Sequence, residues 1–182
     1  TTFILFTGMS IENGGLGYDA KANGYVFAFV GLVGVLVQGV FMRSKLAQRL
    51  DSRVMMVFGI LVCGLGIGWI PYLSPEPFVI VLIPMAMIAL GNGLFQPTQN
   101  TLLTLEAKST SLDLGRVMGA QEGYGAMARI IGPIVAAFVW AETVDRPDKW
   151  DYHTVFRLSF ALAVLAIISQ ITLRLTHQNK QP

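Results

Sequence analysis

Charged residues are scarce in this sequence. Of its 182 residues only 13% are Asp, Glu, Lys or Arg, against about 25% in soluble domains, while 53% are hydrophobic and the mean hydropathy is +0.58. Long runs without charge exclude an ordinary soluble domain and indicate an integral membrane protein surrounded by a lipid bilayer. The net charge of +2 requires no nucleic-acid partner, because the basic residues follow a topological pattern described below.

Cysteine and the motifs of soluble enzymes are also missing or rare. The one cysteine, Cys63, lies in an apolar run and can form neither an internal disulfide nor a metal cluster. The sequence has no P-loop, no HExxH and no GxSxG motif. We therefore expect no metal, no cofactor and no enzymatic activity.

The chain does contain a series of apolar runs of the length that crosses a hydrocarbon core, about 20 residues. Full spans are predicted at residues 24–42, 54–73, 78–105, 116–141 and 154–175, after a partial span at 1–10. The predicted fold is therefore an all-α membrane protein. Because the chain begins within apolar residues that look like the second half of a spanning helix, we expect a fragment whose upstream part is missing.

The distribution of basic residues predicts the orientation in the membrane, because short loops make neighbouring spans alternate in direction. One set of loops, with the C-terminal tail, holds eight basic residues: Arg43, Lys45, Arg49, Arg53, Lys108, Arg116, Arg174 and Lys180. The other set holds Lys21, Arg146 and Lys149, with Arg157 just inside the last span. We therefore expect a multi-pass membrane protein with a cytoplasmic C-terminus.

The span at 116–141 carries two charges, Glu122 and Arg129, where lipid tolerates neither. They are seven residues apart, so they share a helix face at about 10 Å along the axis and are expected to be too distant to pair directly. A substrate, water or another helix could lie between them, or Arg129 could be neutralised by an acid elsewhere in the bundle. Small residues and a proline predict close helix packing on this span: Gly119, Gly123, Gly132 and Pro133.

The preceding span carries a stripe of amides at spacings of four, Asn92, Gln96 and Asn100. Pro97 removes a backbone hydrogen bond inside this stripe, so we expect an interrupted helix. Amides beside a break suit a solute pathway. Hydrogen bonding between helices explains the same stripe, and the sequence leaves both interpretations open.

Several short motifs occur in order across nearly the whole chain. They are Gly24-Tyr25-Val26-Phe27-Ala28 with Gly31-Leu32 and Gln38-Gly39, Leu46-Ala47-Gln48-Arg49 with Arg53, Ala89-Leu90-Gly91-Asn92-Gly93 with Pro97, and Gly119 to Gln121 with Ala128-Arg129-Ile130-Ile131-Gly132-Pro133. Together they resemble the C-terminal half of a major facilitator superfamily transporter, within the subgroup of tetracycline-efflux-like drug–proton antiporters.

This resemblance implies helices seven (partial) to twelve of a twelve-helix fold, whose two halves rock about a central cavity. Residues 1–182 would then be the C-terminal transmembrane half, and the N-terminal six-helix half would lie upstream in the same chain or in a separate chain. The resemblance also implies a place in a bacterial inner membrane. The loop at 46–53 is similar to the second copy of the cytoplasmic gating motif of the family, and Arg49 and Arg53 match its basic positions. Gln48 stands where that motif has an acid, and Asp51 where it has a glycine, which weakens a charge-latch role.

The leading functional hypothesis is proton-coupled efflux of a small amphipathic solute or drug by alternating access. Arg129, Glu122, Gln121 and the amide stripe would line the cavity, with Glu122 as the candidate proton carrier because it is the acid within a span. Two alternatives stay open. One is a transporter-like structural or assembly subunit of a larger membrane complex, and the other is a proton-coupled uptake symporter.

Overall fold

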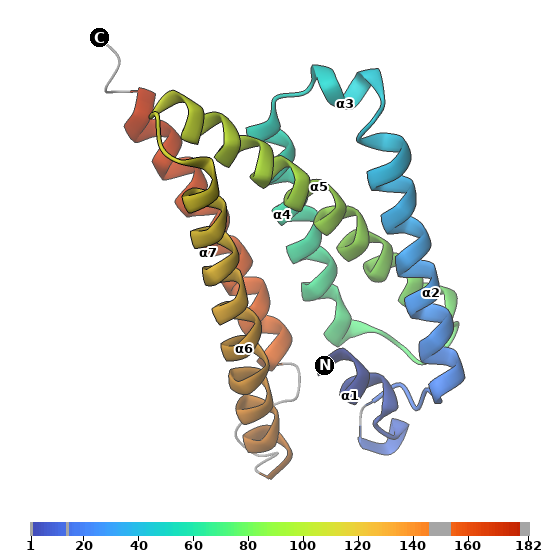
Figure 1. Ribbon diagram of the computed structural model, residues 1–182. Helices are drawn as coiled ribbons and strands as arrows, with labels where there is room; N and C mark the ends of the chain where they lie inside the picture. The colour runs from blue at the N-terminus through green and yellow to red at the C-terminus, as the bar shows by residue number, and fades with distance from the viewer. Residues whose placement is uncertain (1, 14, 146–153, 179–182) are drawn as a thin grey trace.

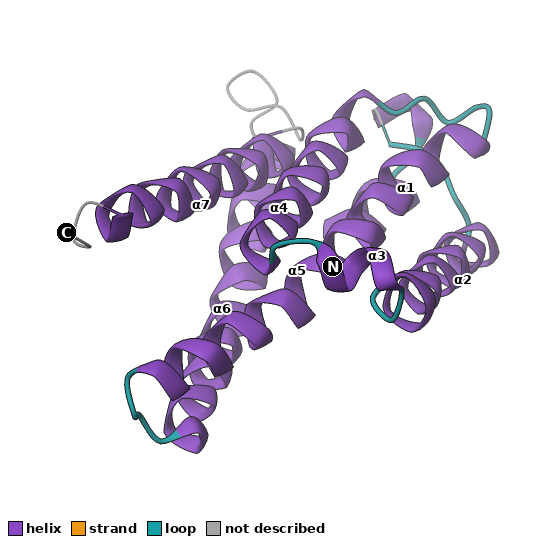
Figure 2. Ribbon diagram, turned by 90° about the horizontal axis from the view of Figure 1, so that it is seen from above, coloured by secondary structure: helices purple, strands orange, loops and turns teal. Residues whose placement is uncertain are grey.

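The computed structural model describes residues 2–13, 15–145 and 154–178, and within them every regular element is a helix (Figures 1 and 2). Four helical stretches are long and apolar enough to cross a membrane: Ala20–Phe41, Ser52–Tyr72, Val79–Ser109 and Leu114–Glu142. A shorter apolar stretch covers Thr154–Gln170. The protein is thus an all-α membrane protein, as its composition predicts.

Seven α-helices follow one another along the chain. They are α1 (Thr2–Gly8), α2 (Ala20–Leu36), α3 (Lys45–Arg49), α4 (Ser52–Trp69), α5 (Val79–Ser109), α6 (Leu114–Asp145) and α7 (Thr154–Gln178). Three short turns supplement them: a 3-10 turn η1 (Ile11–Asn13), a π-helical turn η2 (Val37–Phe41) that continues α2, and a 3-10 turn η3 (Ile70–Tyr72) after α4. Each predicted span overlaps one helix.

Capping side chains explain where several helices begin. The Asp19 carboxylate accepts the Ala22 N–H at 2.7 Å, so α2 begins four residues before the predicted span at 24–42. In the same way the Ser44 hydroxyl accepts the Ala47 N–H at 3.2 Å and starts α3 inside a segment expected to be a loop. Asp51 caps α4 by accepting the Arg53 N–H at 2.7 Å.

The prediction of an interrupted helix at Pro97 is wrong. α5 runs without a break through Pro84 and Pro97 over its 31 residues. A proline removes a single backbone bond, and the surrounding helical bonds keep the axis continuous. Next to Pro97, the Thr98 hydroxyl also donates to the carbonyl oxygens of Leu94 and Phe95, at 2.6 and 2.9 Å.

The closest helix packing lies between α4 and α5, which are each other's main neighbours. A Cβ atom added to Gly91 of α5 would lie 2.6 Å from both the Gly59 carbonyl oxygen and Cys63 Cβ of α4. One added to Gly66 would lie 2.9 Å from the Pro84 carbonyl oxygen. Glycine at these positions lets the two backbones touch. The other face of α4 packs against α7, where Gly64 faces Ala163.

Two buried clusters hold the bundle together. The larger joins α1, the α1–α2 loop, α2, η3, α5 and α7 through Phe6, Leu16, Val26, Ile70, Leu73, Val81, Met85 and Phe156. The smaller joins η2, α3, α4 and α5 through Val37, Ala47, Met55 and Leu94. Figure 1 shows α3, the α5–α6 turn and the C-terminal end of α7 at one end of the bundle, with α1 at the other.

Helix α6 is the exception to this packing. In the most apolar 18-residue stretch of α6 no residue is buried, whereas 39% of the corresponding stretches of α4 and α5 is buried. It makes only sparse contacts with α5, α7 and α1. The expected packing of this helix inside a bundle is therefore not made by the part of the chain that the structure describes.

Candidate functional site

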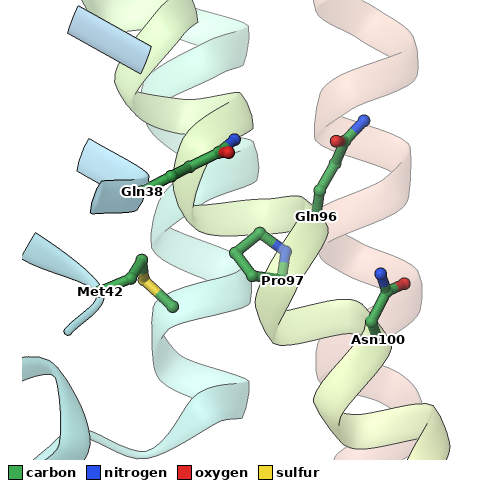
Figure 3. A pocket seen from close by; sticks show the side chains of 5 residues that line it. All are labelled: Gln38, Met42, Gln96, Pro97 and Asn100. Atoms are coloured by element: carbon green, nitrogen blue, oxygen red, sulfur yellow. The ribbon is translucent and has the colours of Figure 1, made fainter. Parts of the chain in front are cut away.

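A polar groove lies beside α5 at the middle of the amide stripe (Figure 3). Its volume is about 240 Å³, and its lining consists of Gln38, Met42, Gln96, Pro97 and Asn100. Gln38 lies in η2 and Met42 directly follows it, and the other three residues come from α5. The groove thus gathers three carboxamide side chains around a proline ring and a thioether, and none of the lining residues is charged.

Gln38 is a site residue that sequence reasoning left out. It lies in the π-helical turn η2, and its neighbour Val37 packs on Gly93 of α5. A Cβ on Gly93 would lie 2.8 Å from Val37 Cγ1, so the glycine allows the close approach that brings Gln38 to the groove. An amide inside an uncharged apolar run was the available signal. The π turn, which is common at functional sites, has no signature in the sequence.

Gln121 of α6 extends this polar surface. Its Nε2 donates to the Asn100 Oδ1 at 2.8 Å, which joins α6 to α5. Gln96, Asn100 and Gln121 are thus brought together as a set. Asn92 lies apart from the groove lining, where its Oδ1 accepts a long hydrogen bond of 3.9 Å from the Cys63 thiol of α4.

Glu122 and Arg129 form an ion pair, so the expectation that they cannot pair directly is wrong. Arg129 Nη2 lies 3.3 Å from Glu122 Oε2. The Cα–Cβ bonds of a helix tilt toward its N-terminus, so the long Arg129 side chain extends back over two turns and closes the distance along the axis. The side chain passes over Gly125, where an added Cβ would lie 3.8 Å from Arg129 Nη2, an ordinary van der Waals contact.

This ion pair is open to its surroundings. The side chains of Arg129 and Glu122 are 71% and 72% exposed. The most apolar stretch of their helix, α6, has no buried residue. Charges that face hydrocarbon are costly, even when paired. This face of α6 therefore fits a water-filled cavity or a protein partner better than it fits lipid.

The small residues of α6 have no packing partner in the described chain. A Cβ added to Gly119, Gly123 or Gly132 would meet nothing within 4 Å, and Pro133 is exposed. Their predicted role in helix packing therefore finds no partner among the described helices. Packing against a second bundle stays a prediction.

The loop that resembles a gating motif shows no charge latch. Arg49 and Arg53 are exposed and make no ion pair with the described residues. Gln48 Nε2 donates to the Arg43 carbonyl oxygen at 3.4 Å, and the Arg53 backbone N–H donates to Asp51. The departures from the motif at Gln48 and Asp51 agree with this lack of latch contacts.

Fold and groove together define an all-α membrane protein with polar side chains on its helix faces. The chain is similar to the class D tetracycline resistance protein of Salmonella ordonez, with 22% identity over 182 aligned positions. The alignment covers 96% of this chain and 40% of that relative, so the chain spans about two fifths of the relative's length. No family model matches the chain, and no solved structure matches it.

Proposed function

We propose that this chain is one helical bundle of a secondary transporter that exports a small amphipathic solute in exchange for protons. The observation that carries the proposal is the groove of Gln38, Gln96 and Asn100 on membrane-spanning helices, because polar groups in such helices typically face a solute path or a partner. The similarity to a tetracycline resistance protein over nearly the whole chain supports a solute-exporting function.

The lining of the groove favours a solute with neutral hydrogen-bonding groups. Each carboxamide both donates and accepts hydrogen bonds, so it can bind hydroxyl, carbonyl or amide groups. Met42 and Pro97 add an apolar surface beside them. An amphipathic molecule matches this combination better than a simple ion does.

Glu122 is the proposed proton carrier. It lies within α6, whereas Glu106 and Glu142 lie near the ends of their helices. Protonation neutralises the Glu122 carboxylate and removes its attraction for Arg129, whose guanidinium is then free to bind the solute or a polar partner. Proton uptake and solute binding at this site would thus be coupled through one ion pair.

The proposal includes a second six-helix bundle, in the same chain or in a separate one. Six helices by themselves do not enclose an alternating-access cavity, which lies between two structural repeats. The exposed ion pair and the open glycines Gly119, Gly123 and Gly132 form the α6 surface that such a bundle would cover. By this proposal α1, α2, α4, α5, α6 and α7 correspond to helices seven (partial) to twelve of the twelve-helix fold, and the short α3 lies in the loop between helices eight and nine.

Replacement of Arg129 by Ala tests the proposal. We expect proton-driven tetracycline transport by membrane vesicles to fall to background, because the Glu122 pair and the cationic group at the site are both lost. Membrane insertion should be unchanged, since the Arg129 side chain is 71% exposed in the described part of the chain. Normal transport by Arg129→Ala would contradict the assignment of Arg129 to the solute and proton path. Arg129→Lys serves as the control that keeps the positive charge.

Vesicle orientation separates export from the alternatives. Inverted vesicles should accumulate the solute when a proton gradient is applied, whereas an uptake symporter would accumulate it in right-side-out vesicles. A structural subunit would transport in neither orientation. Its purification would instead yield a stable complex with other membrane proteins.

A further inference from the structure

The loop between η2 and α4 concentrates positive charge at one end of the bundle. Arg43, Lys45, Arg49 and Arg53 are all exposed, and Asp51 is the one acid between them. The Asp51 carboxylate caps α4 by accepting the Arg53 N–H, and it forms no ion pair with any of the four. The loop therefore presents a net charge of +3 that no described residue neutralises.

Packing sets which side of α3 faces outward. Ala47 is 6% exposed and belongs to the buried cluster with Val37, Met55 and Leu94. Lys45 and Arg49 are four residues apart, so they share the helix face opposite Ala47. Like charges at this spacing repel each other, and an anion placed between them relieves the repulsion.

Apolar side chains lie at the same level as these charges. Leu50, at the end of α3, is 44% exposed, and Val54, in the first turn of α4, is 51% exposed. The loop joins the ends of two membrane-spanning stretches, Ala20–Phe41 and Ser52–Tyr72, so it lies at the membrane surface. Basic and apolar side chains together match the interface where lipid headgroups meet acyl chains, and a soluble anion would use only the basic ones.

We propose that the segment Arg43–Val54 is a docking surface for anionic lipid headgroups, with Lys45 and Arg49 as its central phosphate contacts and Leu50 inserted into the bilayer interface. A juxtamembrane cluster of this size attracts anionic lipids through each of its basic residues. The proposal does not depend on transport activity, so it can fail or hold independently of the proposed function.

The same end of the bundle offers a matched control. The α5–α6 turn carries Lys108 and Arg116, both exposed, but also Glu106 and Asp113, so its net charge is zero. A double variant there, Lys108→Gln with Arg116→Gln, removes as many positive charges as Lys45→Gln with Arg49→Gln. The two doubles change the net charge of the protein equally and differ only in where the charge is lost.

The test is a titration of the purified intact protein in detergent with phosphatidylglycerol or phosphatidylcholine, followed by native mass spectrometry. Wild type should prefer phosphatidylglycerol, and added salt should weaken that preference. The Lys45/Arg49 double should lose about tenfold or more in affinity for phosphatidylglycerol, while the Lys108/Arg116 double should stay within about twofold. Circular dichroism and size-exclusion profiles equal to wild type establish that both doubles are folded.

Four results would overturn the proposal. Wild type could bind both lipids equally, which removes the preference that the basic loop explains. The two doubles could lose affinity equally, which makes total charge rather than this loop responsible. Inorganic phosphate could bind to the same residues as tightly as the lipid does, which identifies a site for soluble anions. A salt-insensitive preference in wild type also counts against it, and this measurement needs no variant.

Discussion

The α4–α5 pair and α6 contain similar residues but use them differently. In the pair, Gly59, Gly66 and Gly91 lie where one backbone touches the other. In α6, Gly119, Gly123 and Gly132 have open space where a side chain would be. Small residues at short spacings indicate that a close approach is possible, but they do not say whether the approaching helix belongs to the same chain.

The polar residues follow the same division. At the glycine contacts between α4 and α5 the neighbouring atoms are backbone or come from apolar side chains and Cys63. The open face of α6 instead carries Glu122 and Arg129, while Gln121 binds Asn100 where α6 meets α5, beside the groove. The contact between α4 and α5 thus supports the fold, while the proposed solute and proton path combines the open face of α6 with the groove, whose lining comes from α5 and from Gln38 and Met42.

The variant Gly91→Ala tests the packed α4–α5 pair, and we expect it to have the largest effect on stability. Gly91→Ala places a Cβ 2.6 Å from the Gly59 carbonyl oxygen and Cys63 Cβ, so the backbones must separate. We expect the free energy of unfolding to fall by about 1–3 kcal/mol, in spite of the better helix propensity of alanine. Thermal unfolding of the detergent-solubilised protein measures it.

Gly123→Ala is the matched control on α6. Nothing lies within 4 Å of the added Cβ, so the change should be neutral or stabilise by up to about 1 kcal/mol. Equal destabilisation by the two variants would show that α6 is packed as closely as α5. The contrast between the closely packed α4–α5 pair and the open α6 would then not hold.

A smaller effect is expected at Tyr18, which belongs to the packed region through its ring contact with Phe78. Its hydroxyl donates to the Pro75 carbonyl oxygen at 3.0 Å. Burial raises the pKa of the Tyr18 phenol above 10, and the negative charge of Glu76 adds to the shift. Tyr18→Phe should cost about 1 kcal/mol at neutral pH, the usual net value of one hydrogen bond.

The sign of the Tyr18 pKa shift also predicts a pH dependence. A raised pKa in the folded state means that the stabilisation is fully present below the unfolded pKa of about 10, and is lost as the pH rises through the folded pKa. Unfolding measured across the alkaline range should therefore show a loss in wild type that Tyr18→Phe lacks.

The smallest expected effect probes the link between the two regions, the hydrogen bond from Gln121 to Asn100. A double-mutant cycle with Asn100→Ala and Gln121→Ala should give a coupling of about 0.6 kcal/mol, the average for hydrogen bonds between membrane helices. The control is a cycle between Asn92 and Gln121, because Asn92 contacts Cys63 instead. Additive effects in both cycles would mean that α6 is not held to α5 by this bond.

Sequence reasoning did well where a property depends on one element alone. The apolar runs predict the helices because crossing a bilayer demands only length and apolarity, and α5 and α6 overlap the spans expected at 78–105 and 116–141. It failed at Pro97, where the helical hydrogen bonds on either side outweigh the one that is lost. It failed again at Glu122 and Arg129, because the axial spacing ignores the reach and tilt of an arginine side chain.

Composition and periodicity were sufficient to predict an all-α membrane protein with a stripe of amides in one apolar run and the charges of Glu122 and Arg129 inside the next. The tertiary structure decided which of these residues meet. Gln38 reaches Gln96 and Asn100 only because Gly93 lets the π turn approach α5. Gln121 reaches Asn100 only because α6 starts beside the end of α5. Such contacts depend on how helices far apart in the sequence pack. The periodicity of one helix does not specify which helix lies beside it.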